Sequence, residues 1–277
     1  MNFLYSGADF TYPLLSHDKA LQLVGLLGFD GVDIGLFQDR SHIQPSMIHG
    51  NAANHGRLIK VKAEAAGLIV ADVFLQSDTD FAKMAVNHPD KPVREETRRQ
   101  FLELIEFADA CGSKHVSCLP GVVFDNDSGS MTRCQEELAW RVETAKSAGL
   151  VFGIEAHIGS IVDTPDKALE LVKSVPGLTF TLDYTHFTRA GIPDSDVEPM
   201  IKYASHFHAR GAKPGALQTT LADNTIDYKR IIKVMKQTGY RGFIDIEYVW
   251  TDWENCNRSD NVSESIMLMQ LMKGAEL

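Results

Sequence analysis

The stretch TPDKALELVKSVPGLTFTLDYTHF, residues 164–187, shows the pattern that decides the fold. Its first part predicts a helix that begins with Pro165, a residue suited to the first helical position, and that ends near Gly177. A run of β-branched and aromatic residues follows and predicts a buried strand. That strand delivers Asp183 and then His186 at its far end. A carboxylate and an imidazole at the end of a buried segment require an explanation.

The same unit of an amphipathic helix, a glycine and an apolar run recurs along the chain. In residues 93–112, for example, Phe101, Leu104 and Ile105 share one helical face, and Gly112 stands in the position of a C-terminal cap. Eight strand candidates alternate with such helices: FLYSGADF (3–10), VDIGLFQ (32–38), LIVADVFLQ (68–76), HVSCLPG (115–121), LVFGIEAH (150–157), LTFTLDYTH (178–186), SHFHARGA (205–212) and FIDIEYVW (243–250). A last helix is expected over residues 261–272, packed on the strands.

Alternating strands and helices over 277 residues are typical of either a closed (β/α)8 barrel or an open doubly wound sheet. No GxGxxG motif or Walker-type GxxxxGK motif follows a strand, which disfavours a nucleotide-binding open sheet. Eight units in this length favour the barrel. We therefore predict an α/β protein with a single (β/α)8 TIM-barrel domain over residues 1–277.

The composition restricts the partners. The net charge is -10, whereas a protein that neutralises nucleic-acid phosphates is normally basic, so nucleic acid is not expected. No signal segment and no long apolar run occurs, so a membrane is not expected either. The four cysteines have no disulfide-type spacing, which indicates reduced thiols and a cytoplasmic location.

Four polar residues stand at the ends of the last four predicted strands: Glu155, Asp183, His208 and Glu247. Because functional side chains of such barrels lie at the C-terminal strand ends, these four are expected to converge. A single acidic residue there often caps a helix instead, but three converging carboxylates need a compensating charge. Three hard oxygens and one imidazole suit one octahedral divalent cation, Mn²⁺ first, with Mg²⁺, Co²⁺ or Zn²⁺ as alternatives.

The blocks IEAH (154–157), LDYTH (182–186), HFHARGA (206–212) and IEYVW (246–250), in this order, resemble the xylose-isomerase-like TIM-barrel superfamily. That group includes ketose 3-epimerases, hydroxypyruvate isomerase, inosose dehydratase and apurinic-site endonucleases. The resemblance covers nearly the whole chain in architecture, while its specific motifs lie in the second half. These motifs identify the superfamily and leave the substrate open.

The resemblance implies that Glu155, Asp183, His208 and Glu247 hold the metal and that His186 binds a substrate oxygen. Members with two or three metals use extra histidines at the ends of earlier strands. Here the second and third strands end in VDIGLFQ and VADVFLQ, without histidine. This difference argues for one metal and against an endonuclease.

The expected chemistry follows from a metal that chelates a carbonyl and the adjacent hydroxyl, because the C–H bond between them becomes acidic and an enediolate is stabilised. Glu155 and Glu247 are the expected acid/base pair of a sugar isomerase or epimerase. The alternatives are a lyase that dehydrates a keto-inositol-type substrate, an apurinic-site phosphodiesterase and a non-catalytic sugar-binding barrel. The expected partner is a small sugar-type molecule, and since barrels of this superfamily often pair, a homo-oligomer is compatible with the sequence.

Further residues are candidates for substrate binding. His157 shares the strand face of Glu155 and is expected at the barrel mouth. Arg210 and Lys213 would clamp an anionic group of the substrate or pair with surface acids. Trp250 would stack on a sugar face or pack under a loop.

Two other features carry weaker expectations. The segment FQDRSHIQPSMIHGNAANHGR, residues 37–57, is expected to be a long loop, either solvated or a lid over the mouth. His206 has the strand face of His208 but lies deeper, so it is expected in the core or behind the ligands.

Overall fold

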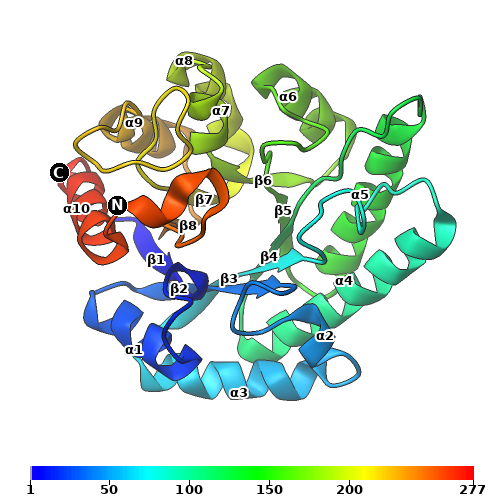
Figure 1. Ribbon diagram of the computed structural model, residues 1–277, viewed down its shortest axis with the longest axis horizontal. Coiled ribbons are helices and arrows are strands. Elements are labelled where there is room, and N and C mark those ends of the chain that lie inside the picture. The colour runs from blue at the N-terminus through cyan, green and yellow to red at the C-terminus, as the bar shows by residue number, and fades with distance from the viewer. Residues whose placement is uncertain (1) are drawn as a thin grey trace.

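A computed structural model describes residues 2–277 and confirms the predicted fold class. Eight parallel strands pair in the order β1 to β8 and close into a barrel (Figure 1). The strands are β1 (Leu4–Ala8), β2 (Gly31–Phe37), β3 (Ile69–Gln76), β4 (His115–Cys118), β5 (Val151–Ile154), β6 (Thr179–Asp183), β7 (Ala204–Ala209) and β8 (Phe243–Ile246).

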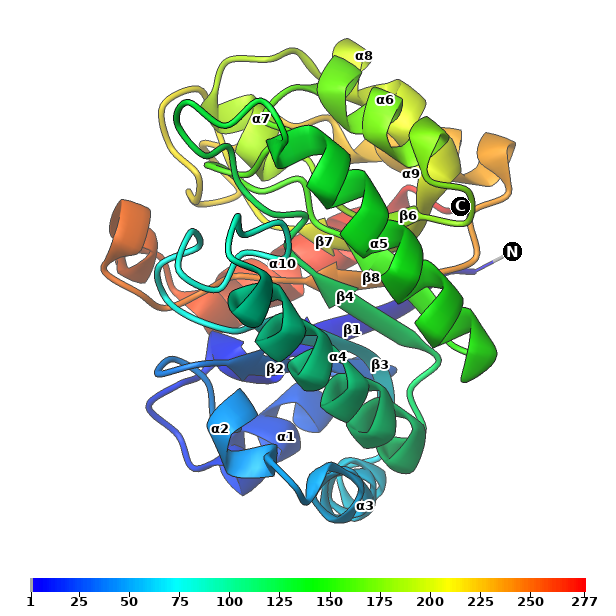
Figure 2. The same cartoon turned by 90° about the vertical axis from the view of Figure 1, so that its right-hand side faces the viewer.

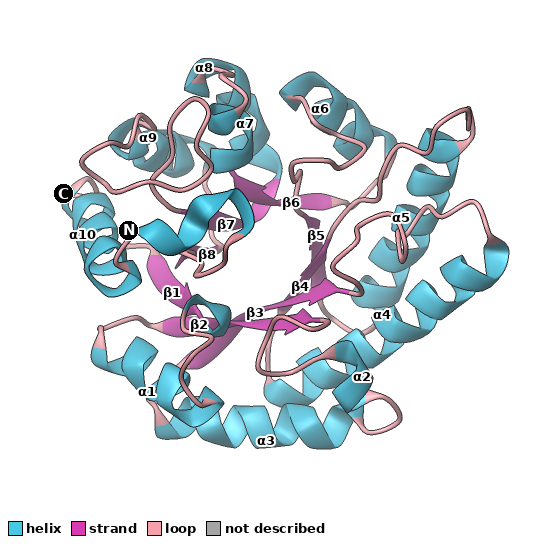
Figure 3. Cartoon of the chain, in the orientation of Figure 1, coloured by secondary structure: helices cyan, strands magenta, loops and turns pink. Residues whose placement is uncertain are grey.

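Helices enclose this ring of strands on its outer side (Figure 3). The α-helices are α1 (His17–Leu26), α2 (Pro45–Ile48), α3 (Ala52–Ala65), α4 (Lys91–Cys111), α5 (Ser130–Ser147), α6 (Pro165–Ser174), α7 (Thr185–Arg189), α8 (Asp194–Val197), α9 (Tyr228–Thr238) and α10 (Asn261–Gly274). Short 3₁₀ helices are η1 (Asp9–Thr11), η2 (Glu198–Tyr203) and η3 (Trp253–Arg258).

The helix boundaries follow local chemistry. Gly112 follows α4 with a φ of 86°, so it forms the left-handed cap that the sequence predicts. Helix α6 begins at Pro165, but it ends at Ser174 rather than near Gly177. The reason is Pro176, whose ring disfavours a helical conformation for the preceding residue.

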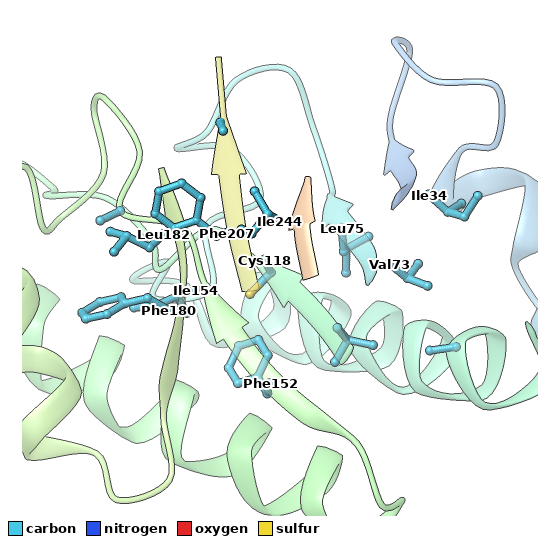
Figure 4. Packing of buried hydrophobic residues seen from close by; sticks show 14 of the residues in the cluster. Ile34, Val73, Leu75, Cys118, Phe152, Ile154, Phe180, Leu182, Phe207 and Ile244 are labelled. Carbon is cyan, nitrogen blue, oxygen red and sulfur yellow. The ribbon is translucent and has the colours of Figure 1, made fainter. Parts of the chain in front are cut away.

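The hydrophobic core lies between the barrel and its helices. Side chains on the outer face of the strands, such as Ile34, Val73, Phe152, Phe180 and Phe207, are buried there (Figure 4). Burial of one such side chain stabilises a fold by about 1.5–3 kcal/mol. The outer layer therefore supplies the apolar burial that holds the barrel closed.

The interior of the barrel is polar, in contrast to the branched aliphatic layers that usually fill such barrels. His206 on β7 donates a hydrogen bond of 2.5 Å to Asp33 on β2, and these strands are not neighbours, so the bond crosses the interior. The buried polar side chains that the strands contribute include Ser6, Asp33, Asp72, Ser117, Thr181, His206 and Asp245.

A β-bulge in β3 turns Asp72 toward this interior. Val32 of β2 pairs with Val70, and the next pair joins Asp33 to Asp72, so Ala71 is an extra residue on β3. Successive side chains of a strand point to opposite faces, and one extra residue therefore switches the face. Val70 consequently lies in the outer apolar layer, although it is separated from Asp72 by only one residue.

A second bulge acts in the same way on β7. Phe180 of β6 pairs with Ala204, and the next pair joins Thr181 to His206, so Ser205 is the extra residue. Ala204 packs against the outer core, whereas His206 reaches Asp33 inside the barrel. The bulge thus sets the direction of the strand half that carries the histidines.

The segment of residues 37–57 differs from the expected loop. Pro45 starts the short helix α2, and α3 begins at Ala52, so much of the segment is helical. Glu103 of α4 holds the connection between α2 and α3 in place. Its Oε1 lies 2.8 Å from His49 Nδ1 and accepts a hydrogen bond from Gly50 N at 2.9 Å. The expectation of one long loop was therefore wrong for Pro45–Ile48 and from Ala52 onward, while residues 38–44 remain a loop and contribute Arg40 to the mouth.

Three other observations bear on the sequence expectations. All four cysteines are buried free thiols. Within residues 2–277, no helix has both the length and the apolar character needed to span a bilayer. The last helix, α10, buries Leu268, Met269 and Met272, as expected of a helix packed on the barrel.

Replacement of Phe152 by Ala should cost about 3–5 kcal/mol of the free energy of unfolding, because it leaves a cavity in the outer apolar layer. Val151 on the same strand is 44% exposed and serves as the matched control. Its replacement by Ala should cost less than about 1 kcal/mol. Urea denaturation measures both, and equal losses would contradict this placement of the core.

Candidate active site

Three of the predicted ligands meet where β5, β7 and β8 end at the barrel mouth. His208 Nδ1 lies 2.8 Å from Glu155 Oε1 and 3.6 Å from Glu247 Oε2. One ligand atom from each residue lies within 4.8 Å of the others, and all three residues are buried. The geometry of this group, called the Glu–His–Glu cluster below, is suited to a cation.

Asp183, the fourth predicted ligand, joins the cluster through Arg210. Arg210 Nη2 donates a hydrogen bond of 2.9 Å to Asp183 Oδ2, and Arg210 Nη1 lies 3.4 Å from Glu247 Oε2. Thr185 steadies both partners, because its hydroxyl accepts a hydrogen bond from Arg210 Nε at 3.2 Å and its N–H donates to Asp183 Oδ1 at 2.8 Å. Arg210 is therefore a buried partner of two carboxylates of the site.

The charges of the cluster shift the pKa values of its members. Burial alone would lower the pKa of His208, but Glu247, Asp33 and Glu155 outweigh it and raise this pKa well above its usual value. Burial would raise the pKa of Glu155, yet its hydrogen bond and charge interaction with His208 lower it on balance. His208 is therefore protonated and Glu155 ionised at neutral pH when no metal is bound.

Glu247 behaves differently from Glu155. Burial is the main cause that raises the pKa of Glu247 to about 7, against the opposing effect of His208 and Arg210. Its buried Oε2 has no hydrogen-bond partner among residues 2–277. A buried oxygen without a partner is costly, and a cation in the Glu–His–Glu cluster would satisfy it.

The charge balance also fits a divalent cation. Glu155, Asp183 and Glu247 carry three negative charges when all are ionised, and Arg210 supplies one positive charge. A divalent ion beside a neutral His208 would supply the other two. Three of the four predicted ligands, Glu155, His208 and Glu247, thus form a group that could hold such an ion, whereas Asp183 lies beside it in contact with Arg210.

His186 lies next to this group as a neutral imidazole. Its Nε2 is 3.4 Å from Asp183 Oδ2 and 3.8 Å from Glu155 Oε2. Burial, reinforced by nearby positive charges, lowers the pKa of His186 well below its usual value. Because Nδ1 accepts a hydrogen bond of 3.3 Å from Ile158 N, the proton of the neutral ring is on Nε2, which can donate to an oxygen in the site.

His157 lines the mouth, as its strand face predicts. Burial lowers the pKa of His157, so the ring is neutral. Its Nδ1 donates to the carbonyl oxygen of Ile158 at 2.8 Å, which leaves Nε2 as an acceptor. The ring stacks on Trp253 with centroids 5.4 Å apart and an angle of 16°.

A cavity of about 170 Å³ opens above the Glu–His–Glu cluster. Segment η3, shown in orange in Figure 2, lies at this end of the barrel and contributes Trp253. The cavity is lined by Phe10, Pro13, Phe37, Arg40, Phe74, Gln76, Glu155, His157, Arg210, Glu247, Val249, Trp250, Thr251 and Trp253. Its size fits a small molecule, with polar groups at the base and aromatic rings on the walls.

The other predicted contacts divide into two kinds. Trp250 lines the cavity and is 43% exposed, which suits a wall residue. Lys213 lies outside the lining residues and forms a surface ion pair of 2.8 Å with Asp223. Of the two interpretations that the sequence left open for Lys213, the structure supports the pairing with a surface acid.

Several lining residues were not predicted. Phe37 and Gln76 end β2 and β3, so the rule that selected the residues of strands five to eight would also have found them. Arg40 follows β2 in the next turn and donates a hydrogen bond to Gln76. Its position depends on the turn geometry, for which the sequence gives no comparable signal.

Comparisons with known proteins agree with the barrel fold. The family model described as xylose isomerase-like TIM barrel matches residues 21–272. The L-ribulose-5-phosphate 3-epimerase UlaE of Salmonella paratyphi A is 23% identical over 241 residues, which cover 84% of this chain and 82% of that protein.

Two solved structures share the fold. The structure of an L-ribulose 3-epimerase matches with a TM-score of 0.77 and 17% identity, covering 100% of this chain and 95% of that chain. The probable 3-DHS dehydratase AsbF of Bacillus anthracis matches with a TM-score of 0.71 and 15% identity, covering 96% of this chain and 98% of that chain. At these identities the structural likeness shows the fold alone.

Binding of Mn²⁺ should release protons, because the metal-free protein carries one on His208 and a half-occupied one on Glu247 at pH 7. We expect about one to two protons per cation at pH 7. The number of protons released per cation should fall toward one at pH 9, where Glu247 is ionised. The affinity for Mn²⁺ should weaken as the pH drops below 7. Calorimetry in buffers of different ionisation enthalpy measures this number, and binding without proton release would contradict the ligand assignment.

Proposed function

The chain belongs to the xylose isomerase-like TIM-barrel family, and on this premise we propose that it is a divalent-metal-dependent isomerase or epimerase of a sugar or sugar derivative. The observation that carries the proposal is the meeting of Glu155, His208 and Glu247 from three separate strands, with ligand atoms within 4.8 Å. The curated relatives named as ribulose-phosphate 3-epimerases support the epimerase form of the proposal.

Glu155, Asp183, His208 and Glu247 would hold the metal. When bound, a divalent cation neutralises these carboxylates and stabilises negative charge on substrate oxygens, which makes the carbon between them more acidic. Asp183 would enter this set beside Arg210, which holds one oxygen of the carboxylate by a hydrogen bond of 2.9 Å. Arg210 retains one positive charge at the site throughout.

Glu155 and Glu247 would move the proton. Both lie near His208 Nδ1 and come from the ends of the separate strands β5 and β8, so they would approach one carbon from different directions. The pKa of Glu155 is lowered and that of Glu247 is raised to about 7, a difference that suits one ionised base and one proton donor. Removal of the proton by one glutamate and its return by the other would invert that carbon.

The walls of the cavity, together with His186 beside Glu155, would orient the substrate. The neutral His186 can donate from Nε2 to a substrate oxygen next to Glu155, and His157 can accept from a hydroxyl. Trp250 and Trp253 offer aromatic faces for the C–H surface of a sugar ring or chain. These contacts suit a small polyol with a carbonyl group.

Incubation of ketoses, hydroxypyruvate and inososes in D₂O with Mn²⁺ should incorporate deuterium at the carbon next to the carbonyl of the substrate. The reason is that the abstracted proton exchanges on a glutamate before it returns. NMR measures the incorporation, and protein treated with EDTA is the control that should show none.

The products separate the reaction types. A deuterated epimer supports epimerisation, a carbonyl shifted by one carbon supports isomerisation, and loss of water supports the lyase alternative. If no member of a broad panel exchanges in the metal-loaded protein, the proposed chemistry is wrong.

Replacement of Glu247 by Gln should leave the fold intact and reduce turnover by about 10²–10⁴-fold, the usual contribution of a general acid or base. Glu143→Gln is the matched control, since this glutamate is 69% exposed in its side chain on α5. Steady-state kinetics on the substrate found by exchange measures both. A fully active Glu247→Gln enzyme would remove Glu247 from the catalytic role.

A further inference from the structure

The two ring nitrogens of His208 face different parts of the barrel. Nδ1 faces the mouth, where Glu155 Oε1 lies 2.8 Å away. Nε2 faces the polar interior, where Asp33 Oδ2 lies 3.6 Å away. The 3.6 Å separation is slightly longer than a hydrogen bond. Among residues 2–277, Nε2 has no hydrogen-bond partner, so Asp33 is the carboxylate in position to accept its proton.

Asp33 is itself held in place by residues of the polar barrel interior. It is 1% exposed, and its Oδ2 accepts a hydrogen bond of 2.5 Å from His206 Nε2. The ring of His206 stacks on that of His115, with centroids 5.1 Å apart and an angle of 27°. His115 is fixed in turn, because its Nδ1 lies 2.7 Å from Asp72 Oδ1. The hydrogen bond from His206 therefore fixes the oxygen that faces His208.

A neutral imidazole that binds a metal through one nitrogen must carry its proton on the other. A carboxylate that accepts this proton fixes the tautomer and the ring orientation and makes the ligand nitrogen more basic. We propose that Asp33 is the positioning residue that holds His208 with Nδ1 free to bind the cation. This inference rests on the proposed function. It adds Asp33 of strand β2 to the site, one layer deeper in the barrel.

Position also distinguishes Asp33 from the other aspartate of this layer. Asp72 is equally buried, but its two oxygens lie 2.7 Å from His115 Nδ1 and 2.5 Å from Ser117 Oγ. Asp72→Asn thus removes the same charge from the same layer without changing an atom that contacts Asp33 or His208. It is the matched control for Asp33→Asn.

The test measures the dissociation constant of Mn²⁺ by calorimetry, which requires no catalytic turnover. Asp33→Ala removes the acceptor and should weaken Mn²⁺ binding by about 10–100-fold. Asp33→Asn keeps one acceptor oxygen and should lie between Asp33→Ala and the unchanged protein. Asp72→Asn should bind within about threefold of the unchanged protein. Circular dichroism of the metal-free variants checks the fold, and Asp33→Asn alone decides the question if Asp33→Ala does not fold.

The outcomes separate this inference from the proposed function. If the unchanged protein binds no Mn²⁺, the proposed metal site is wrong. If it binds Mn²⁺ and both Asp33 variants bind equally well, the positioning role is wrong and the metal site stands. An equal loss in Asp72→Asn would also overturn the inference, because the total charge of the layer would then matter rather than the contact with His208.

Discussion

The structure depends on the burial of three carboxylates, those of Glu155, Asp183 and Glu247, at one end of a closed barrel. Such groups repel one another and lose hydration, so each needs a partner in a fixed position. Arg210 and His208 provide these partners, at 2.9 Å from Asp183 and 2.8 Å from Glu155. Burial is the main cause of the high pKa of Glu247, and the remaining negative charge makes the site suitable for a cation.

The barrel can bury these carboxylates because the residues that stabilise the fold and the residues that form the site lie in different layers. The aromatic and aliphatic side chains pack outside the barrel, against the helices. The interior is then left for groups that hold one another by hydrogen bonds, such as His206 with Asp33 and His115 with Asp72. Buried polar networks of this kind cost free energy where a member has no partner, and they specify geometry where all members are paired. The paired groups of this interior thus support the base of the mouth.

Much of this was predictable from local patterns. The recurring unit of helix, glycine and strand predicted the barrel. The rule that functional residues stand at the C-terminal ends of strands selected Glu155, His208 and Glu247, which the structure brings together. The pairing of Arg210 with Asp183 was missed, because a long side chain can turn toward solvent or inward, and the sequence does not fix its direction. Asp33 of β2 was missed because its contact is with His208 of β7, five strands later in the chain. The two residues come together only when the barrel closes.

The bulge at Ser205 has a consequence for evolution. It resets the alternation of β7, so the half of the strand below it and the half that carries His208 can change independently. A homologue without the extra residue would need one residue fewer between its preceding helix and its ligand histidine. An alignment with such a homologue would need a one-residue gap at this point, and an ungapped alignment would match its ligand histidine to a side chain on the opposite face.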